Sequence, residues 1–349
     1  MINEKLLEDC LDKIFAKKHV HSTVMRVESE DAFFVWEGAR GDMRADSKFF
    51  IASVTKMYIA AVIMQLIEEN KLSLDEKIAP YLSDDIMRSL HVYKGRDYSG
   101  ELTVKHLLSN TSGLPDYFFG KEDGKRVADM LMGGADEPWG LERSVNHIKK
   151  IKPKFAPGRG VEYSDVNFQL LGKIVESLTG QDIGAVFSER IFRPLGLHNT
   201  YSYKDPKDTQ PVPFYHGARR LWLPVYMASA GPDGGIVSTA NEITVFAKAF
   251  WGGRLFPRER IDGLKQWRLL TPPPGMFYFG IGLEKQPTPW ILSPRKPISE
   301  IVGFWGQTSA YTWYNPDTGL YFSGTANQTN VSGHTAIMNA IIKMIKTVR

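Results

Sequence analysis

A serine and a lysine three residues apart, Ser53 and Lys56, are the first residues of this sequence whose types and spacing could do chemistry. On a helix, residues three apart share a face, so a helix here would bring the amine beside the hydroxyl. A serine hydroxyl is a weak nucleophile until a base takes its proton. Lysine can be that base where burial keeps its amine neutral, and the apolar run after Lys56 predicts such a setting. The unpaired amides of the helix N-terminus, including that of Ser53, would face a developing oxyanion.

The spacing by itself has low specificity, because Ser293 and Lys296 match the same pattern. That second stretch contains Pro294 and is followed by no apolar helix, so nothing there predicts a desolvated amine. For Ser53 taken alone, chance or helix capping is an open alternative. The surrounding sequence must therefore distinguish the two matches.

Between residues 45 and 330 the sequence resembles the superfamily of serine β-lactamases and penicillin-binding proteins, and most closely the class C β-lactamases and family VIII carboxylesterases. The matching segments are 49–78, 102–117, 155–180, 191–201, 229–243 and the C-terminal hairpin. The resemblance implies a hydrolase that forms an acyl-enzyme on Ser53 and is then attacked by water. It also implies the β-lactamase and transpeptidase-like fold.

The second motif of this superfamily is Tyr-x-Asn, and Tyr163 and Asp165 occupy its first and third positions. The resemblance implies that Tyr163 and Lys56 together move the proton from Ser53 to the leaving group. Asp165 stands where the family usually has a neutral amide donor, and we assign it to the substrate-binding residues. A carboxylate near Lys56 would favour the ammonium form, which suggests that Tyr163, held as phenolate by the lysine charge, carries more of the base role. The alternative role of Asp165 is that of a helix N-cap.

The third motif is Lys-Thr-Gly or His-x-Gly, and the matching residues are Phe304, Trp305 and Gly306, followed by Gln307. The cation that helps the family recognise a substrate carboxylate is absent. We assign residues 304–306 to substrate binding, because an apolar surface with an indole N–H favours a neutral, hydrophobic acyl group. Gly306 would let its strand approach Ser53, and the resemblance implies that the amide of Gln307 completes the oxyanion hole. An ordinary strand glycine is the alternative for Gly306.

The elements that must position these residues predict an α+β fold. Hydrophobic periodicity and turn residues indicate strands at 21–28, 31–37, 311–314 and 320–326, and helices at 53–69, 165–178, near 183–192 and at 334–347. Capping signals predict a short helix after Ser73 and another after Thr103, whereas residues 120–160 are expected to be rich in loops. Strands at both ends predict one antiparallel sheet flanked by helices and built from both termini, with an inserted, mostly helical region. We place the sheet domain at 1–52 and 225–349, the helical domain at 53–224, and the active site between them.

Composition excludes several classes of protein. The chain has 349 residues, of which 43% are hydrophobic, so a sizeable core is expected. Its 43 basic and 39 acidic residues form no polybasic run, so we expect no nucleic-acid partner. We find neither a signal peptide nor an apolar run of roughly 18 residues, and therefore expect a cytoplasmic protein without membrane attachment. The lone Cys10 allows no internal disulfide, and without HExxH or CxxC motifs we expect no metal or cofactor.

The sequence thus predicts a serine hydrolase acting on small-molecule esters or amides, with a carboxylesterase as the favoured subtype. One alternative is a β-lactamase or a D-amino-acid peptidase such as a D,D-carboxypeptidase, which the absent third-motif cation and export signal disfavour. Another is a catalytically silent relative that binds a ligand or has a structural role. Retention of Ser53, Lys56 and Tyr163 disfavours that reading. The oligomeric state is left open.

Overall fold

A central antiparallel sheet joins the two ends of the chain in this computed structural model, which describes residues 3–122, 124–272, 276–288, 293 and 295–348. Its eight strands follow the order β12-β13-β14-β15-β16-β17-β1-β2. N-terminal β1 pairs with C-terminal β17, and Val24 lies opposite Thr325. The prediction of one sheet built from both termini is confirmed. The strands are β1 (Ser22–Ser29), β2 (Val35–Gly41), β12 (Arg268–Thr271), β13 (Phe277–Phe279), β14 (Glu284–Lys285), β15 (Val302–Trp305), β16 (Ala310–Asn315) and β17 (Leu320–Thr325).

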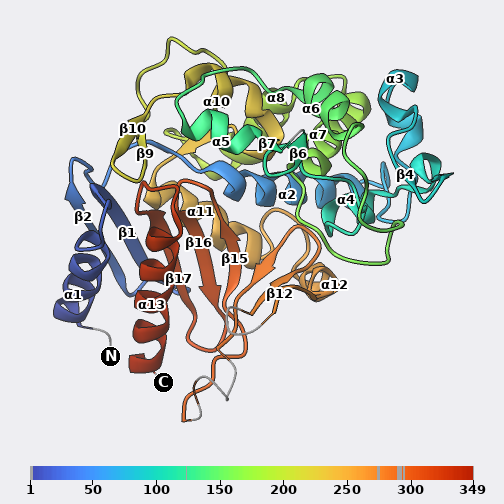
Figure 1. The fold of residues 1–349 in the computed structure, drawn as a ribbon. Helices are drawn as coiled ribbons and strands as arrows, with labels where there is room; N and C mark the ends of the chain where they lie inside the picture. The colour runs from blue at the N-terminus through green and yellow to red at the C-terminus, as the bar shows by residue number, and fades with distance from the viewer. Residues whose placement is uncertain (1–2, 123, 273–275, 289–292, 294, 349) are drawn as a thin grey trace.

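Helices cover both faces of this sheet (Figure 1). On one face, α1 (Glu4–Phe15) and α13 (Val331–Val348) lie side by side. Helix α1 buries Leu7, Leu11 and Ile14, whose helical spacing places them on a single face. On the other face, α11 (Ala240–Trp251) packs against β17, β1 and β16. The sheet is therefore the middle of three layers, and each side of it has its own apolar core.

The central part of the chain forms a mostly helical region above this sheet (Figure 1). Helix α2 (Thr55–Glu68) is buried on nearly every side, as its apolar run predicts. The other helices are α3 (Asp84–Met87), α4 (Val104–Leu108), α5 (Val127–Met132), α6 (Leu141–Ile148), α7 (Asp165–Thr179), α8 (Ile183–Phe187), α9 (Arg193–Leu195), α10 (Pro224–Ala230) and α12 (Ile261–Leu264). The short strands are β3 (Phe49–Phe50), β4 (Val92–Tyr93), β5 (Arg96–Asp97), β6 (Lys121–Glu122), β7 (Lys125–Arg126), β8 (Tyr201–Ser202), β9 (Phe214–His216), β10 (Arg219–Leu221) and β11 (Ile236–Ser238). No helix in the described ranges is both long enough and apolar enough to span a membrane.

Two helix ends are fixed by local caps, and the one at Thr103 confirms the prediction. Thr103 accepts a hydrogen bond from the amide of His106, whose ring in turn accepts from the amide of Thr103. This reciprocal pair fixes the start of α4. Gly180 ends α7 with a φ of +69°, in the left-handed region that glycine adopts at low cost.

The predicted helix after Ser73 is wrong. The amide of Ser73 does bond the carboxylate of Glu76 at 3.0 Å, as a capping box requires. However, the carbonyls of Leu74 and Glu76 accept hydrogen bonds from the amides of Lys105 and Val104. Because the segment pairs with a distant stretch, its carbonyls cannot form a helical ladder.

Other boundaries differ from the prediction for similar reasons. The strand expected at 31–37 begins only at Val35, because Ala32 adopts a φ of +61° in a turn closed by the bond from the Ser29 amide to the Phe34 carbonyl. The stretch 120–160 includes two helices, α5 and α6, as well as loops. The helix expected near 183–192 is α8 followed by a π-helical turn. The division into domains at 52 and 225 stays a prediction.

Candidate active site

A strained turn places Ser53 at the N-terminal end of α2. Strand β3 pairs with β11, and the amide of Ile51 bonds the carbonyl of Ile236 at 3.0 Å. The next residue, Ala52, has a φ of +46°, which a residue with a Cβ adopts at a cost of about 1–2 kcal/mol. A short 3₁₀ turn over Ala52–Val54 then leads into α2. The hydroxyl of Ser53 is thereby held at the wall of a cleft.

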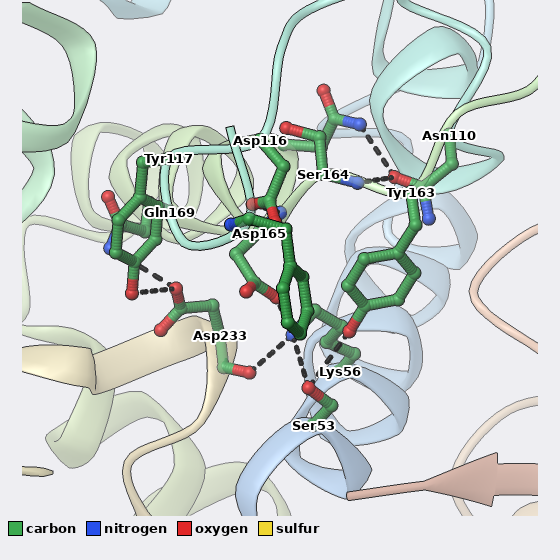
Figure 2. A network of polar contacts seen from close by, with 12 residues as sticks. Ser53, Lys56, Asn110, Asp116, Tyr117, Tyr163, Ser164, Asp165, Gln169 and Asp233 are labelled. Carbon is green, nitrogen blue, oxygen red and sulfur yellow. Dashed lines mark hydrogen bonds and ion pairs between the residues drawn. The ribbon is translucent and has the colours of Figure 1, made fainter. Parts of the chain in front are cut away.

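The amine and the phenol named from the sequence both lie within hydrogen-bond distance of the Ser53 hydroxyl (Figure 2). Lys56 Nζ lies 2.9 Å from Ser53 Oγ, as expected for residues three apart on a helix. Tyr163, which precedes α7, donates its hydroxyl to the same oxygen at 2.8 Å. Both groups donate in this state, so one of them must lose a proton before the pair can accept the proton of Ser53.

Three acceptors surround the amine of Lys56, whose side chain is completely buried. Besides Ser53 Oγ, Nζ lies 2.6 Å from the carbonyl oxygen of Asp233 and 2.6 Å from Oδ1 of Asp165. The first two contacts are hydrogen bonds, and the third is an ion pair. The substitution of Asp165 for the family's asparagine thus places a carboxylate directly beside the amine.

The hypothesis that the lysine charge holds Tyr163 as a phenolate is wrong for this structure. Burial, followed by the negative charges of Asp165 and Glu284, raises the pKa of Tyr163 well above its ordinary value. Asp165 pairs directly with Lys56, so the lysine charge is offset before it can act on the phenol. Tyr163 is therefore a neutral donor to Ser53 in this structure.

Asp165 does not serve as a helix cap. Ser164 holds the cap position of α7, and Asp165 is the first residue of the helix. Its side chain turns to Lys56, while its amide donates to Oδ1 of Asp116 at 3.0 Å. The N-cap alternative is therefore excluded by where the carboxylate points.

Three more buried carboxyl groups surround the Lys56–Asp165 pair. Burial, with a contribution from the charge of Asp165, raises the pKa of Asp116 to about 7. Burial likewise raises the pKa of Asp233 and of Glu284 well above the ordinary range. Sequence reasoning named none of the three. Asp116 and Asp233 lie inside segments that carry the family resemblance, whereas Glu284 has no signal in the sequence.

Gly306 lets β15 reach the turn that carries Ser53. A Cβ at Gly306 would lie 2.3 Å from the carbonyl oxygen of Ile51, so no other residue fits without moving the backbone. This observation agrees with the close approach expected from the sequence and excludes an ordinary strand glycine. The next residue, Gln307, also lines the cleft, and its side chain donates to the carbonyl of Thr329 at 3.2 Å.

The structure does not bring Phe304 into the cleft. Successive side chains on a strand point to opposite faces of the sheet. Phe304 is fully buried in the core, where its ring contacts Phe279 edge to face at 5.8 Å. Trp305 does line the cleft, and its indole packs against the ring of His334. Phe304 therefore supports the site through Phe279, whose ring contacts Tyr163.

The cleft combines an apolar wall with acidic side chains. In its described lining, the carboxylates are those of Asp165, Asp233 and Glu284, and neither Lys nor Arg occurs. The aromatic residues Phe118, Phe119 and Tyr226 line the cleft, whereas Tyr117 and Trp313 lie in the core. In the described part of the chain, no cluster of three or more His, Cys, Asp or Glu side chains is arranged to hold a metal ion.

The second match to the Ser-x-x-Lys pattern is not a site. The hydroxyl of Ser293 donates to the carbonyl of Lys296 at 2.8 Å. The amine of Lys296 instead donates to the carbonyl of Lys346, also at 2.8 Å. Amine and hydroxyl therefore have separate partners; Pro294, between them, lies outside the described residues.

His334, which sequence reasoning passed over, supports the peptide unit between Gly306 and Gln307. Its Nε2 lies 3.0 Å from the carbonyl oxygen of Gly306, and a carbonyl only accepts, so Nε2 carries the hydrogen. The carbonyl of Gly306 and the amide N–H of Gln307 belong to one planar unit. A bond to one end of that unit therefore orients the other end, which the family resemblance assigns to the oxyanion hole.

We expect His334→Ala to lower kcat for an ester substrate by about 10-fold with little change in KM, because an oxyanion donor acts mainly in the transition state. His334→Gln should recover part of the loss, since its amide can donate to the same carbonyl. Steady-state kinetics of both variants measure this effect. A loss confined to KM, or equal losses in the two variants, would contradict the positioning role.

Asp233→Asn should stabilise the fold more at about pH 8 than at about pH 5. The folded-state pKa of Asp233 is raised above the unfolded value of about 4, so its contribution is complete below that value and is lost as the pH rises. Asparagine has no such loss, and its amide oxygen can still accept from Tyr117 and Gln169, which both donate to Oδ2 at 3.2 Å. Thermal unfolding midpoints at the two pH values test this. An equal gain at both would show that the carboxyl does not titrate as expected.

Comparison with known proteins agrees with this geometry. Penicillin-binding protein 4 of Amycolatopsis lactamdurans is 28% identical over 218 residues, which are 58% of this chain and 50% of that protein. Esterase EstB of Burkholderia gladioli is 29% identical over 181 residues, or 50% of this chain and 43% of that protein. The matches thus span half or less of the length of these curated relatives.

Solved structures match over nearly the whole chain. The D-amino acid amidase of Ochrobactrum anthropi has a TM-score of 0.79 at 22% identity and covers 99% of both chains. At such identity the likeness shows the fold, and it confirms the predicted β-lactamase and transpeptidase-like architecture. The sequence profile named Beta-lactamase matches residues 28–342. The fold and the Ser-Lys-Tyr cluster agree with this match, and the chain belongs to the Beta-lactamase family.

Proposed function

We propose that the protein is a serine hydrolase that cleaves ester or amide bonds through an acyl-enzyme on Ser53, with carboxylic esters as its main substrates. The observation that carries the proposal is the contact of Ser53 Oγ with both Lys56 Nζ, at 2.9 Å, and the hydroxyl of Tyr163, at 2.8 Å. These contacts lie at a cleft whose wall is mostly apolar. Relatives named as an esterase and as a D-amino acid amidase support chemistry at an acyl group.

Acylation begins when Ser53 Oγ attacks the carbonyl carbon of the substrate. The pair of Lys56 and Tyr163 takes the serine proton, and the amides of Ser53 and Gln307 stabilise the oxyanion that forms. The bond to the leaving group then breaks, and the leaving group receives the proton from the same pair. Water repeats the sequence at the acyl-enzyme and releases the acid. The apolar residues of the cleft wall reduce the access of water to these charges.

The charge of the cleft supports uncharged esters over anionic substrates. A substrate carboxylate would meet the carboxylate of Asp165, and the described lining offers no Lys or Arg to pair with it. This disfavours β-lactams and peptides with a free C-terminus. Amide hydrolysis is the second candidate, because the D-amino acid amidase matches the fold across 99% of the chain.

The test is a substrate panel with the purified protein: p-nitrophenyl acetate, butyrate and octanoate, nitrocefin, a D-alanyl-D-alanine peptide and a D-amino acid amide. We expect kcat/KM for the best ester to exceed that for the other classes by about 10-fold or more. Efficient nitrocefin turnover with negligible ester cleavage would overturn the ester assignment, and faster amide cleavage would select the second candidate. If no acyl group adds to Ser53 in intact-protein mass spectra, the chain is a silent relative.

A further inference from the structure

Asp165 has one carboxylate oxygen that the site does not use. Its Oδ1 pairs with Lys56 at 2.6 Å, whereas Oδ2 has no hydrogen-bond or ion-pair partner in the described part of the chain. The residue is only 9% exposed and lines the cleft. A carboxylate accepts hydrogen bonds and cannot donate them. This position of the cleft therefore calls for a donor on the substrate.

Two further carboxyl groups of the lining point to a positively charged donor. Asp233 and Glu284 are each 3% exposed. Oδ1 of Asp233 is buried, and no described residue forms a hydrogen bond with it. Lys56 is already paired with Asp165, and the described lining of the cleft itself contains no Lys or Arg. A cation entering the cleft would favour the ionised form of these two carboxyl groups, which burial disfavours.

We propose that the acyl part of the substrate carries a free amino group next to its carbonyl, and that the ammonium donates to Asp165. The inference rests on the proposed acyl transfer to Ser53. One amine, Lys56 Nζ, contacts both Ser53 Oγ and Asp165 Oδ1, so the carboxylate lies beside the position of the attacked carbonyl. An α-amino nitrogen is two bonds from that carbon. The substrate class is therefore α-amino acid esters or amides.

The same contact selects against an acylated amine. An N-acyl group would turn a carbonyl oxygen toward Asp165, and two acceptors cannot form a hydrogen bond. An amide at this position, as in the family's second motif, could donate to that carbonyl, so the change to Asp165 reverses the preference. The side chain of the amino acid would face the apolar part of the lining, which is formed by Phe118, Phe119, Met132, Phe214 and Met227.

Matched esters test the proposal. The series consists of the methyl esters of D- and L-phenylalanine, of N-acetylphenylalanine and of 3-phenylpropionic acid. All share the ester and the phenyl ring, and they differ in the group at Cα or in its configuration. At about pH 6, where the amine is protonated, we expect kcat/KM for one phenylalanine ester to exceed that for the phenylpropionate by about 10-fold or more. Equal or faster turnover of the ester without the amine would overturn the proposal.

Asp165→Asn supplies the second measurement. This variant should bring the ratio between the phenylalanine and phenylpropionate esters close to one, whereas Asp42→Asn, at an exposed position outside the described cleft lining, should leave it unchanged. An unchanged ratio in Asp165→Asn would contradict the proposal. If that variant fails to fold, inhibition of the wild-type protein provides the test. We expect 2-phenylethylamine to inhibit ester turnover about 10-fold more strongly than 2-phenylethanol. Equal inhibition by the two compounds would overturn the proposal.

The two proposals can fail separately. If 3-phenylpropionate adds to Ser53 and is hydrolysed without any preference for the amine, the ammonium site is wrong and the hydrolase stands. If no ester of the series forms an adduct on Ser53, the proposed function itself is wrong. Intact-protein mass spectra after rapid acid quenching distinguish these results.

Discussion

Ser53→Ala should reduce ester turnover by at least about 1,000-fold, because it removes the atom that carries the acyl group. It should also abolish covalent labelling by a fluorophosphonate, which reacts with an activated serine. The wild-type protein should gain the mass of one label, and the variant should gain none. The fold should be retained, because alanine fits wherever serine fits in this short 3₁₀ turn.

The chain contains its own control for this experiment. Ser293 has the same spacing to a lysine, but its hydroxyl bonds a backbone carbonyl and the amine of Lys296 bonds Lys346. Ser293→Ala should therefore retain full turnover and take up one label. A label on the Ser53→Ala protein, or turnover within 10-fold of wild type, would place the nucleophile elsewhere.

Lys56→Met should lower kcat by about 100- to 10,000-fold, since it removes a proton-transfer group and keeps an unbranched side chain. It should also destabilise the protein, because Asp165 loses the partner that lies 2.6 Å away in a buried setting. Removing one partner of a buried ion pair typically costs about 3–5 kcal/mol. Circular dichroism melting and steady-state kinetics measure the two effects together.

A double variant separates folding from chemistry. In Lys56→Met with Asp165→Asn no carboxylate is left unpaired at this position, so the unfolding midpoint should recover while kcat stays low. Recovery of kcat with the midpoint would mean that Lys56 matters only for stability.

Tyr163→Phe tests the second of the two proton-transfer groups. It removes the hydroxyl that donates to Ser53 Oγ at 2.8 Å, and we expect a loss of about 100-fold in kcat. Near-wild-type turnover in this variant would contradict proton transfer shared between Lys56 and Tyr163. The raised pKa of Tyr163 in the free protein also implies that substrate binding, or proton loss from the lysine, must precede its action as a base.

Contacts between residues close in sequence could be predicted without the structure. A spacing of three on a helix brings Lys56 to Ser53, and the same local geometry gives the cap of α4 and the glycine that ends α7. Gly306 was also identified, because the family pattern marks the place where a strand must approach the nucleophile. The β-lactamase-like fold and the α+β class follow from motifs spread along the chain, which the Beta-lactamase profile confirms.

Tertiary structure alone decided which ionisable groups surround Ser53 and Lys56. Asp116, Asp233, Glu284 and His334 come from distant segments, and no periodicity links them to Ser53. Their protonation depends on how much water the packed elements remove, which a sequence of residue types does not state. The same holds for the direction of Phe304, which β15 turns into the core, and for Asp165, whose position made it seem a possible cap. Chain spacing determines neighbours within a few residues, whereas burial and long-range pairing depend on the assembly of both chain ends into one sheet.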